Sequence, residues 1–176
     1  LVFGADLING TAGRTPEQEV EYVKGMVDIG AFLGVQIIRH DVLYSLGGFK
    51  SFDALLPTLA KRVSEISEYA KTKGIKTSVE NHGFICQDPD RCERLFNAVE
   101  SDNFGLLCDM GNFMCADEDP TVSVGILAPY AVHVHAKDMY KSSEPKPGYG
   151  MTRGCNYFKG AIVGEGDVNV EKCLQI

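Results

Sequence analysis

The sequence lacks the features that would place the protein in a membrane or on a nucleic acid. No apolar run approaches the roughly 20 residues that a helix needs to cross a bilayer, and no signal-peptide pattern opens the chain. No basic stripe is present, and the formal net charge is -7. Nucleic-acid phosphates are bound by clustered Lys and Arg, so this charge argues against such a surface. We expect neither a membrane nor a nucleic acid as a partner.

The sequence also lacks any Cys-x-x-Cys pair. Its six cysteines are irregularly spaced, which gives little support to a zinc ribbon, a redox pair or a disulfide framework. Cys108 lies in an apolar run and is expected to pack as a small hydrophobic residue. The Asn9-Gly10-Thr11 triplet matches a glycosylation sequon, but such triplets are common by chance. We expect reduced thiols and a cytoplasmic location.

What the sequence does contain is a regular alternation of apolar segments, amphipathic segments and glycines. With 176 residues, of which 44% are hydrophobic and 23% charged, the chain can form one globular domain with its own core. The first helix has a complete start signal, because Thr15 can serve as N-cap, Pro16 suits the first helical position and Gln18 can close a capping box. Helices are expected over residues 15–33, 51–73 and 88–100, in a short segment from 120, and near residue 176.

Five short apolar segments alternate with these helices and indicate β-strands. They cover residues 1–8, 35–42, 75–82, 104–113 and 130–139. Repeated strand, helix, glycine and strand predict βαβ units and a parallel sheet. No G-x-G-x-x-G follows the first strand, so a dinucleotide-binding sheet has no support. Residues 141–160, which are polar and rich in Gly and Pro, are expected to form a long loop.

Polar residues at the C-terminal ends of the predicted strands favour a closed (β/α)8 TIM barrel over an open sheet. They are Arg39-His40, Glu80-Asn81-His82, Asp109 with Asn112, and His135 to Asp138. A barrel of this kind typically needs about 250 residues. We therefore expect residues 1–176 to form a single, incomplete barrel domain that lacks the opening βα units and the last strand.

Three of these residues form a candidate metal site. Glu80, Asp109 and His135 end three consecutive strands, so in a barrel two carboxylates and an imidazole converge. Each has a simpler explanation when taken alone. Glu80 could pair with a Lys or Arg, and Asp109 could cap the next turn, while His133 and His135 could bond to each other. Together the three would repel one another unless something positive lay between them, and a divalent metal ion meets that need.

The segments SVENHG, LLCDMGN, HVHAKD and GAIVGEGDV resemble the xylose isomerase-like TIM barrels, specifically the sugar phosphate isomerase/epimerase group. The resemblance implies that Glu80, Asp109 and His135 bind one divalent metal ion. In that family a fourth ligand is a Glu on the last barrel strand, which this sequence does not contain. Glu165 is a substitute to consider, although its segment resembles a loop before the final helix and strand.

The same resemblance implies a set of substrate-binding residues. His82, Asn112 and Lys137 match polar positions that surround the substrate in such sites, and Glu165 is a further candidate. Arg39 and His40 are candidates as well, although Arg39 could equally brace the barrel. His133 is expected to be an inward-facing, structural companion of the ligand His135.

A ligand set of mostly oxygen atoms suits Mn²⁺ as the first choice, with Mg²⁺, Co²⁺ or Zn²⁺ as alternatives. The resemblance implies an isomerase or epimerase acting on a sugar, a sugar phosphate or a keto-inositol, in which Glu80 removes a proton next to a carbonyl and the metal stabilises the enediolate. A homo-oligomer is compatible with this function.

Three alternatives stay open. Related family members are lyases or dehydratases that begin with the same proton abstraction. An abasic-site endonuclease shares the barrel, but it would require more metal-binding histidines and a basic groove, whereas this chain has four histidines and a net charge of -7. The third alternative is a truncated barrel without catalytic activity, retained as a subunit or binding protein.

Overall fold

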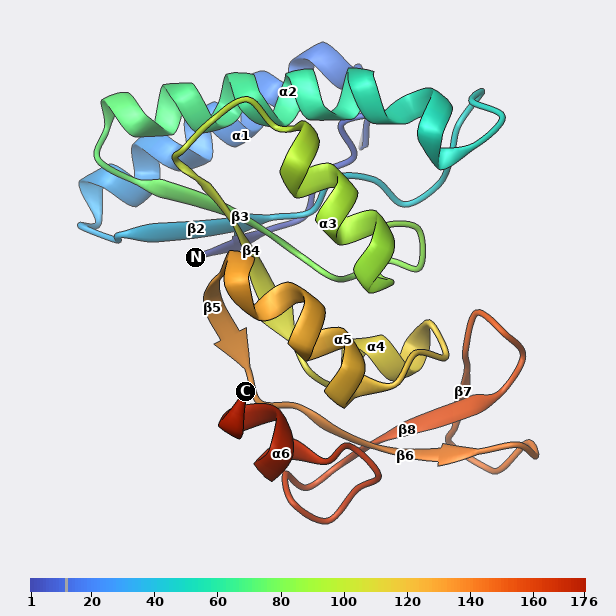
Figure 1. Ribbon diagram of the computed structural model, residues 1–176. Coiled ribbons are helices and arrows are strands. Elements are labelled where there is room, and N and C mark those ends of the chain that lie inside the picture. Colours follow the sequence, from blue (N-terminus) through green and yellow to red (C-terminus); the bar gives the residue numbers. More distant parts are fainter. Residues whose placement is uncertain (12) are drawn as a thin grey trace.

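A parallel β-sheet forms the centre of the computed structural model, which describes residues 1–11 and 13–176 (Figure 1). Each strand pairs in parallel with the strand that precedes it in the chain, as βαβ units require. The strands are β1 (Val2–Phe3), β2 (Ile37–His40), β3 (Lys76–Glu80), β4 (Phe104–Asp109) and β5 (Ala131–His135). The predicted five-stranded parallel sheet is therefore confirmed.

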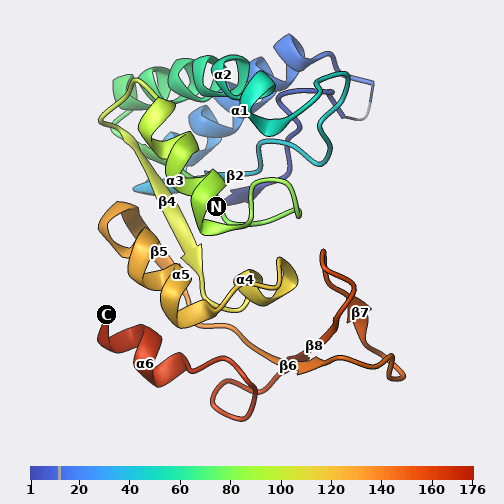
Figure 2. The ribbon, with the colours of Figure 1, turned by 45° about the vertical axis from the view of Figure 1, so that its right-hand side comes forward.

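Helices connect consecutive strands and cover one face of the sheet (Figures 1 and 2). The first begins as predicted, because Thr15 and Gln18 form both bonds of the capping box. The second presents a buried apolar stripe at helical spacing that includes Leu55, Leu59 and Val63. None of the helices described is long and apolar enough to cross a membrane. The helices are α1 (Pro16–Phe32), α2 (Phe52–Thr72), α3 (Pro89–Ala98), α4 (Asn112–Cys115), α5 (Pro120–Leu127), the 3₁₀ helix η1 (Ala128–Tyr130) and α6 (Val170–Gln175).

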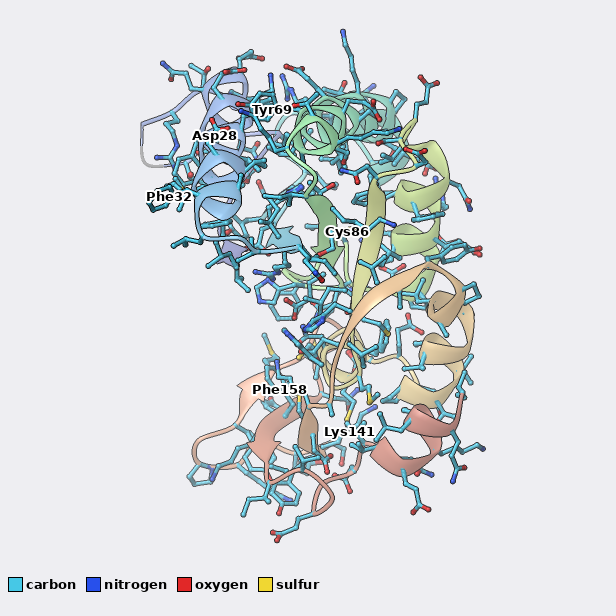
Figure 3. All side chains as sticks on the ribbon, turned by 90° about the vertical axis from the view of Figure 1, so that its left-hand side faces the viewer. Asp28, Phe32, Tyr69, Cys86, Lys141 and Phe158 are labelled. Carbon is cyan, nitrogen blue, oxygen red and sulfur yellow. The ribbon has the colours of Figure 1, made fainter. Side chains whose placement is uncertain are left out.

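The outer surface of the helices is tied together by polar contacts. Tyr69 of α2 donates a hydrogen bond to Asp28 of α1 over 2.9 Å, and Figure 3 shows these two side chains facing each other. Cys86, in contrast, lies in the interior. Cys108 is also buried, so its predicted role as a core residue is confirmed.

Several predicted segments differ from the structure. The expected strands 1–8 and 130–139 are shorter, because β1 covers Val2–Phe3 and β5 covers Ala131–His135. The expected strand 104–113 ends at Asp109, because the Asp109 carboxylate accepts hydrogen bonds from the backbone N–H groups of Gly111 and Asn112 and turns the chain into α4. The expected loop 141–160 is also wrong. This part of the chain builds a separate antiparallel sheet in the order β6-β8-β7, and its Gly- and Pro-rich residues form the connections between strands. These strands are β6 (Asp138–Ser142), β7 (Gly150–Met151) and β8 (Tyr157–Ala161).

Asp138 fixes the turn between β8 and α6. Its side chain is buried, and both carboxylate oxygens accept hydrogen bonds from backbone N–H groups. One oxygen accepts from Gly164 over 2.9 Å and from Gly166 over 2.8 Å, and the other from Met139 over 2.8 Å and Val168 over 3.0 Å. The carboxylate therefore organises the GEGDV segment from within, and this accounts for an acidic residue directly after the predicted site.

Replacement of Asp138 with Asn is expected to make the protein less stable near neutral pH. Burial alone would raise the pKa of Asp138. The backbone N–H groups that donate to its carboxylate together have a larger, opposite effect, so its pKa lies below the usual value. A depressed folded pKa stabilises the fold above the unfolded pKa of about 3.9, and this stabilisation is lost as the pH falls through the folded pKa. An amide would also turn an N–H group toward two backbone donors. We expect a loss of about 2 kcal/mol in the free energy of unfolding at pH 7.

Urea unfolding of the wild type and Asp138→Asn at pH 7 and below pH 4 measures this effect. The difference in the free energy of unfolding between the wild type and Asp138→Asn should become smaller at the acidic pH. Asp167→Asn serves as the control, because the Asp167 carboxylate accepts one backbone bond, from Lys141, at an exposed position. A difference that stays constant with pH would contradict the assigned role of the Asp138 charge.

Candidate metal centre

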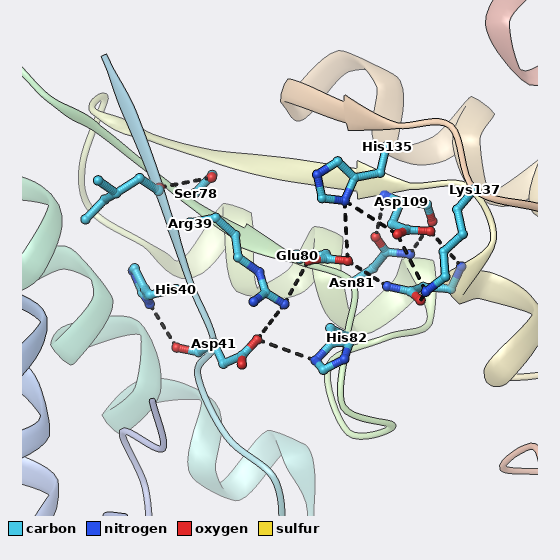
Figure 4. A network of polar contacts seen from close by, with 12 residues as sticks. Arg39, His40, Asp41, Ser78, Glu80, Asn81, His82, Asp109, His135 and Lys137 are labelled. Atoms are coloured by element: carbon cyan, nitrogen blue, oxygen red, sulfur yellow. Dashed lines mark hydrogen bonds and ion pairs between the residues drawn. The ribbon is translucent and has the colours of Figure 1, made fainter. Parts of the chain in front are cut away.

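Glu80, Asp109 and His135 are the last residues of β3, β4 and β5. The parallel register sets Asp109 opposite His135 and Glu80 opposite Leu107, two residues before Asp109. One potential ligand atom from each side chain lies within 4.8 Å of the other two (Figure 4). The structure thus brings together the three residues that the sequence predicts as metal ligands.

The three side chains surround a small space and do not bond to one another. His135 Nδ1 lies 3.8 Å from Glu80 Oε1 and 3.6 Å from Asp109 Oδ2, beyond hydrogen-bond length. Donor atoms that share one ion at about 2.0–2.2 Å lie roughly 3–4 Å apart. The carboxylates are 8% and 3% exposed, so water screens them little. The spacing and the donor types fit a divalent cation.

Each carboxylate turns one oxygen toward His135 and is held by contacts with the protein. Oε2 of Glu80 lies 2.8 Å from the Arg39 guanidinium, while Oε1 accepts a hydrogen bond of 2.7 Å from Asn112 Nδ2. Oδ1 of Asp109 accepts the two backbone bonds that start α4, which leaves Oδ2 toward His135. The rotation of both carboxylates is therefore fixed before any ion binds.

Arg39 places a positive charge next to Glu80. The expected simpler explanation for Glu80, an ion pair, is present in the structure, and Arg39 also lies 2.7 Å from Asp41. Burial raises the pKa of Glu80 above its usual value, with repulsion from Asp109 adding to this and Arg39 opposing it. Glu80 pairs with Arg39 and faces His135 at the same time, so the ion pair and the metal site are compatible.

Four of the predicted substrate residues lie around this centre. Lys137 Nζ donates a hydrogen bond of 2.7 Å to Asn112 Oδ1 and lies 3.9 Å from Asp109 Oδ2. Nδ1 of His82, a half-exposed side chain, is 3.5 Å from the carboxylate of Asp41. Together with Arg39, these residues form a polar rim beside the three ligands (Figure 4).

Two further candidates, Glu165 and His40, lie apart from the ligands, whereas His133 lies beside His135. Glu165 occupies an exposed turn and its backbone N–H bonds to Ile162, and the part of the chain that is described gives it no contact with the three ligands. His40 is fully buried, and burial lowers its pKa, so it stays neutral in the core. His133 shares a face of β5 with His135, with 5.4 Å between the ring centroids, and both line a cavity of about 120 Å³.

Asp41, which the sequence analysis did not name, and Asn81, which it named only as a polar residue at a strand end, complete the network. Asp41 accepts from Arg39 and from the Tyr44 hydroxyl at 3.0 Å, and burial together with this carboxylate raises the pKa of Tyr44 to about 12. Asn81 bonds through its side chain to the backbone of Asp109. The position of Asp41 directly after β2 is the one signal that could have pointed to it.

Comparison with known proteins gives one family. The model of a family described as "Xylose isomerase-like TIM barrel" matches residues 2–176. A xylose isomerase-like TIM barrel protein from Mycobacterium smegmatis, solved in complex with magnesium, matches with a TM-score of 0.71 at 20% identity, over 91% of this chain and 56% of its own. No curated protein matches the sequence.

Two other solved structures match over nearly the whole chain. A probable 3-DHS dehydratase from Bacillus anthracis gives a TM-score of 0.72 at 18% identity, over 99% of this chain and 64% of its own. A D-tagatose 3-epimerase-like protein gives a TM-score of 0.70 at 20% identity, over 99% of this chain and 64% of its own. The chain thus spans 56–64% of the length of these three structures, and the likeness establishes a common fold.

Proposed function

Since the chain belongs to the xylose isomerase-like TIM barrel family, we propose that the protein is a divalent-metal-dependent isomerase or epimerase of a sugar or sugar derivative. The observation that carries the proposal is the convergence of Glu80, Asp109 and His135 at the ends of three adjacent strands. Two of the matched structures support it, one solved with magnesium and one described as epimerase-like.

Glu80, Asp109 and His135 would hold the ion, which when bound polarises a substrate carbonyl as a Lewis acid. The mostly oxygen donor set makes Mn²⁺ our first choice, with Mg²⁺, Co²⁺ and Zn²⁺ as alternatives. In this proposal Glu80 also accepts the proton from the carbon beside the carbonyl. A metal-bound carboxylate is a modest base, which suits a C–H group made more acidic by the neighbouring ion. Arg39 and Asn112 hold that carboxylate in one orientation.

The polar rim supplies the contacts that a sugar requires. Lys137 and His82 are each about half exposed and carry N–H groups that can bond to hydroxyl or carbonyl oxygens. Lys137 is also linked through Asn112 to the carboxylate of Glu80, which places a cation beside the reacting centre. We propose that these two residues bind the substrate hydroxyls, with Arg39 acting through Glu80 and Asp41.

A dehydratase is the second candidate, favoured by the match to the Bacillus anthracis structure. Elimination of water begins with the same removal of a proton beside a carbonyl, so Glu80 would keep its role as base. The two reactions differ in their second step, because an epimerase returns the proton and a dehydratase expels a hydroxyl group.

The function is tested by deuterium exchange in heavy water. We expect the metal-loaded protein to exchange a carbon-bound proton of at least one substrate in a panel of ketoses, ketose phosphates and keto-inositols. Exchange should stop after chelation and return with Mn²⁺. Loss of water from the substrate, detected by mass spectrometry, would select the dehydratase. A protein that binds no divalent metal would contradict the proposal.

A further inference from the structure

The side chain of Asn81 forms two hydrogen bonds with the backbone of one metal-ligand candidate. Asn81 Nδ2 donates to the carbonyl oxygen of Asp109 over 2.9 Å, and the backbone N–H of Asp109 donates to Asn81 Oδ1 over 2.8 Å. Asn81 is 1% exposed (Figure 4). A primary amide offers the same donor and acceptor as a peptide group. The side chain therefore takes the place of a peptide group of a neighbouring strand and makes the hydrogen bonds that such a group would make to Asp109.

This replacement is needed because β3 ends before β4 does. The last paired residues are Glu80 and Leu107, and after Glu80 the chain leaves the sheet into a loop closed by a bridge between His82 and Cys86. The backbone of Asp109 continues past this point in a buried position. Without Asn81, its N–H and C=O groups toward β3 would lose their hydrogen bonds, which is costly in the interior.

The opposite edge of β4 connects the same backbone to the third ligand. Asp109 pairs with His135 in the parallel register, and the backbone N–H of Met110 donates to the carbonyl oxygen of His135 over 3.1 Å. The side-chain amide of Asn81, the residue after Glu80, thus bonds to the backbone of Asp109. The end of β4 is paired in turn with His135 of β5. The ends of β3, β4 and β5 form one continuous hydrogen-bonded row.

We propose that Asn81 is a positioning residue that sets the separation of the three metal ligands. This inference rests on the proposed function, because it requires that Glu80, Asp109 and His135 bind an ion. We assign Asn81 no direct contact with ion or substrate, because its side chain is buried and both of its polar ends bond to the Asp109 backbone. It acts by holding the end of β4 against the end of β3. If the two strand ends moved apart, rotation of the ligand side chains could not restore the distances between their ligand atoms.

Asn81→Ala and Asn103→Ala form a matched pair for testing this role. Asn103 lies just before β4, at its other end, and also makes two hydrogen bonds from its side chain to the backbone, to the carbonyl oxygens of Ser67 and Ile75 at 3.0 and 2.6 Å. Both variants are expected to lower the melting temperature. Asn81→Ala should also weaken Mn²⁺ binding about 10–100-fold, the usual effect of removing a residue that orients a ligand. Asn103→Ala should leave Mn²⁺ affinity unchanged.

Mn²⁺ affinity is measured by calorimetry, and the absorption spectrum of bound Co²⁺ reports the ligand geometry. Asn81→Ser, which keeps one hydroxyl able to pair with one backbone group, is used where Asn81→Ala does not fold, with the same expected direction. Wild-type affinity and an unchanged Co²⁺ spectrum in a folded Asn81 variant would overturn the positioning role. Failure of the wild type to bind metal would overturn the proposed function together with this inference.

Discussion

In Glu80→Gln, proton exchange beside the substrate carbonyl is expected to fall by about 10²–10⁴-fold, the usual effect of removing a general base. Glutamine keeps the size and one oxygen of Glu80 but loses its charge and basicity. Its amide would also meet donors on both sides, because Arg39 and Asn112 each donate to the Glu80 carboxylate. We therefore expect weaker metal binding in addition to the loss of the base.

Deuterium uptake and metal content measured in the same sample separate these two effects. Glu65→Gln is the control, because Glu65 is an exposed residue of α2 paired with Lys24, away from the metal centre. It should exchange at the wild-type rate. Near-normal exchange in metal-loaded Glu80→Gln would assign the proton to another group, and Glu80 would then be a ligand alone.

The second large effect is expected from His135→Ala, which should lower metal affinity by more than about 100-fold, beyond the usual effect of residues that only orient ligands. His135 Nδ1 faces one oxygen of Glu80 and one of Asp109. His133 points to the same side of β5 but is not among the residues that converge on the candidate ion. His133→Ala is therefore expected to bind metal like the wild type.

Metal content after equilibration with Mn²⁺ and dialysis distinguishes the two histidines, with circular dichroism confirming that both variants fold. A variant pair in which His133→Ala loses the metal and His135→Ala retains it would reverse the assignment. Equal loss in both would contradict the separate roles of the two histidines.

The sequence predicted the features that depend on neighbouring residues. The capping box of Thr15 and Gln18 and the strand ending at Glu80 arise from local composition and spacing. The convergence of Glu80, Asp109 and His135 was also predicted, but side-chain contacts that depend on the exact register between strands were not. Asn81 owes its role to the register between β3 and β4, and Arg39 lies beside Glu80 because β2 and β3 are aligned. Alternation along one strand gives no information about register between strands.

The antiparallel sheet shows a different limit. Its strand β8 has two half-buried residues followed by two exposed ones and no apolar face, so neither helix nor strand periodicity stands out in its sequence YFKGA. Glycine and proline in the surrounding segment then favoured a loop prediction. Long-range pairing with β6 over residues 138–142 overrides this local preference.

The order of the strands has a consequence for biosynthesis. Since each strand of the parallel sheet pairs with the one before it, the sheet can grow in the order in which the ribosome delivers the chain. Glu80 and Asp109 emerge first, and His135 follows with β5. A nascent chain therefore brings these three candidate ligands together only when β5 docks on β4. From that moment a bound ion would favour the folded chain over the unfolded one by mass action.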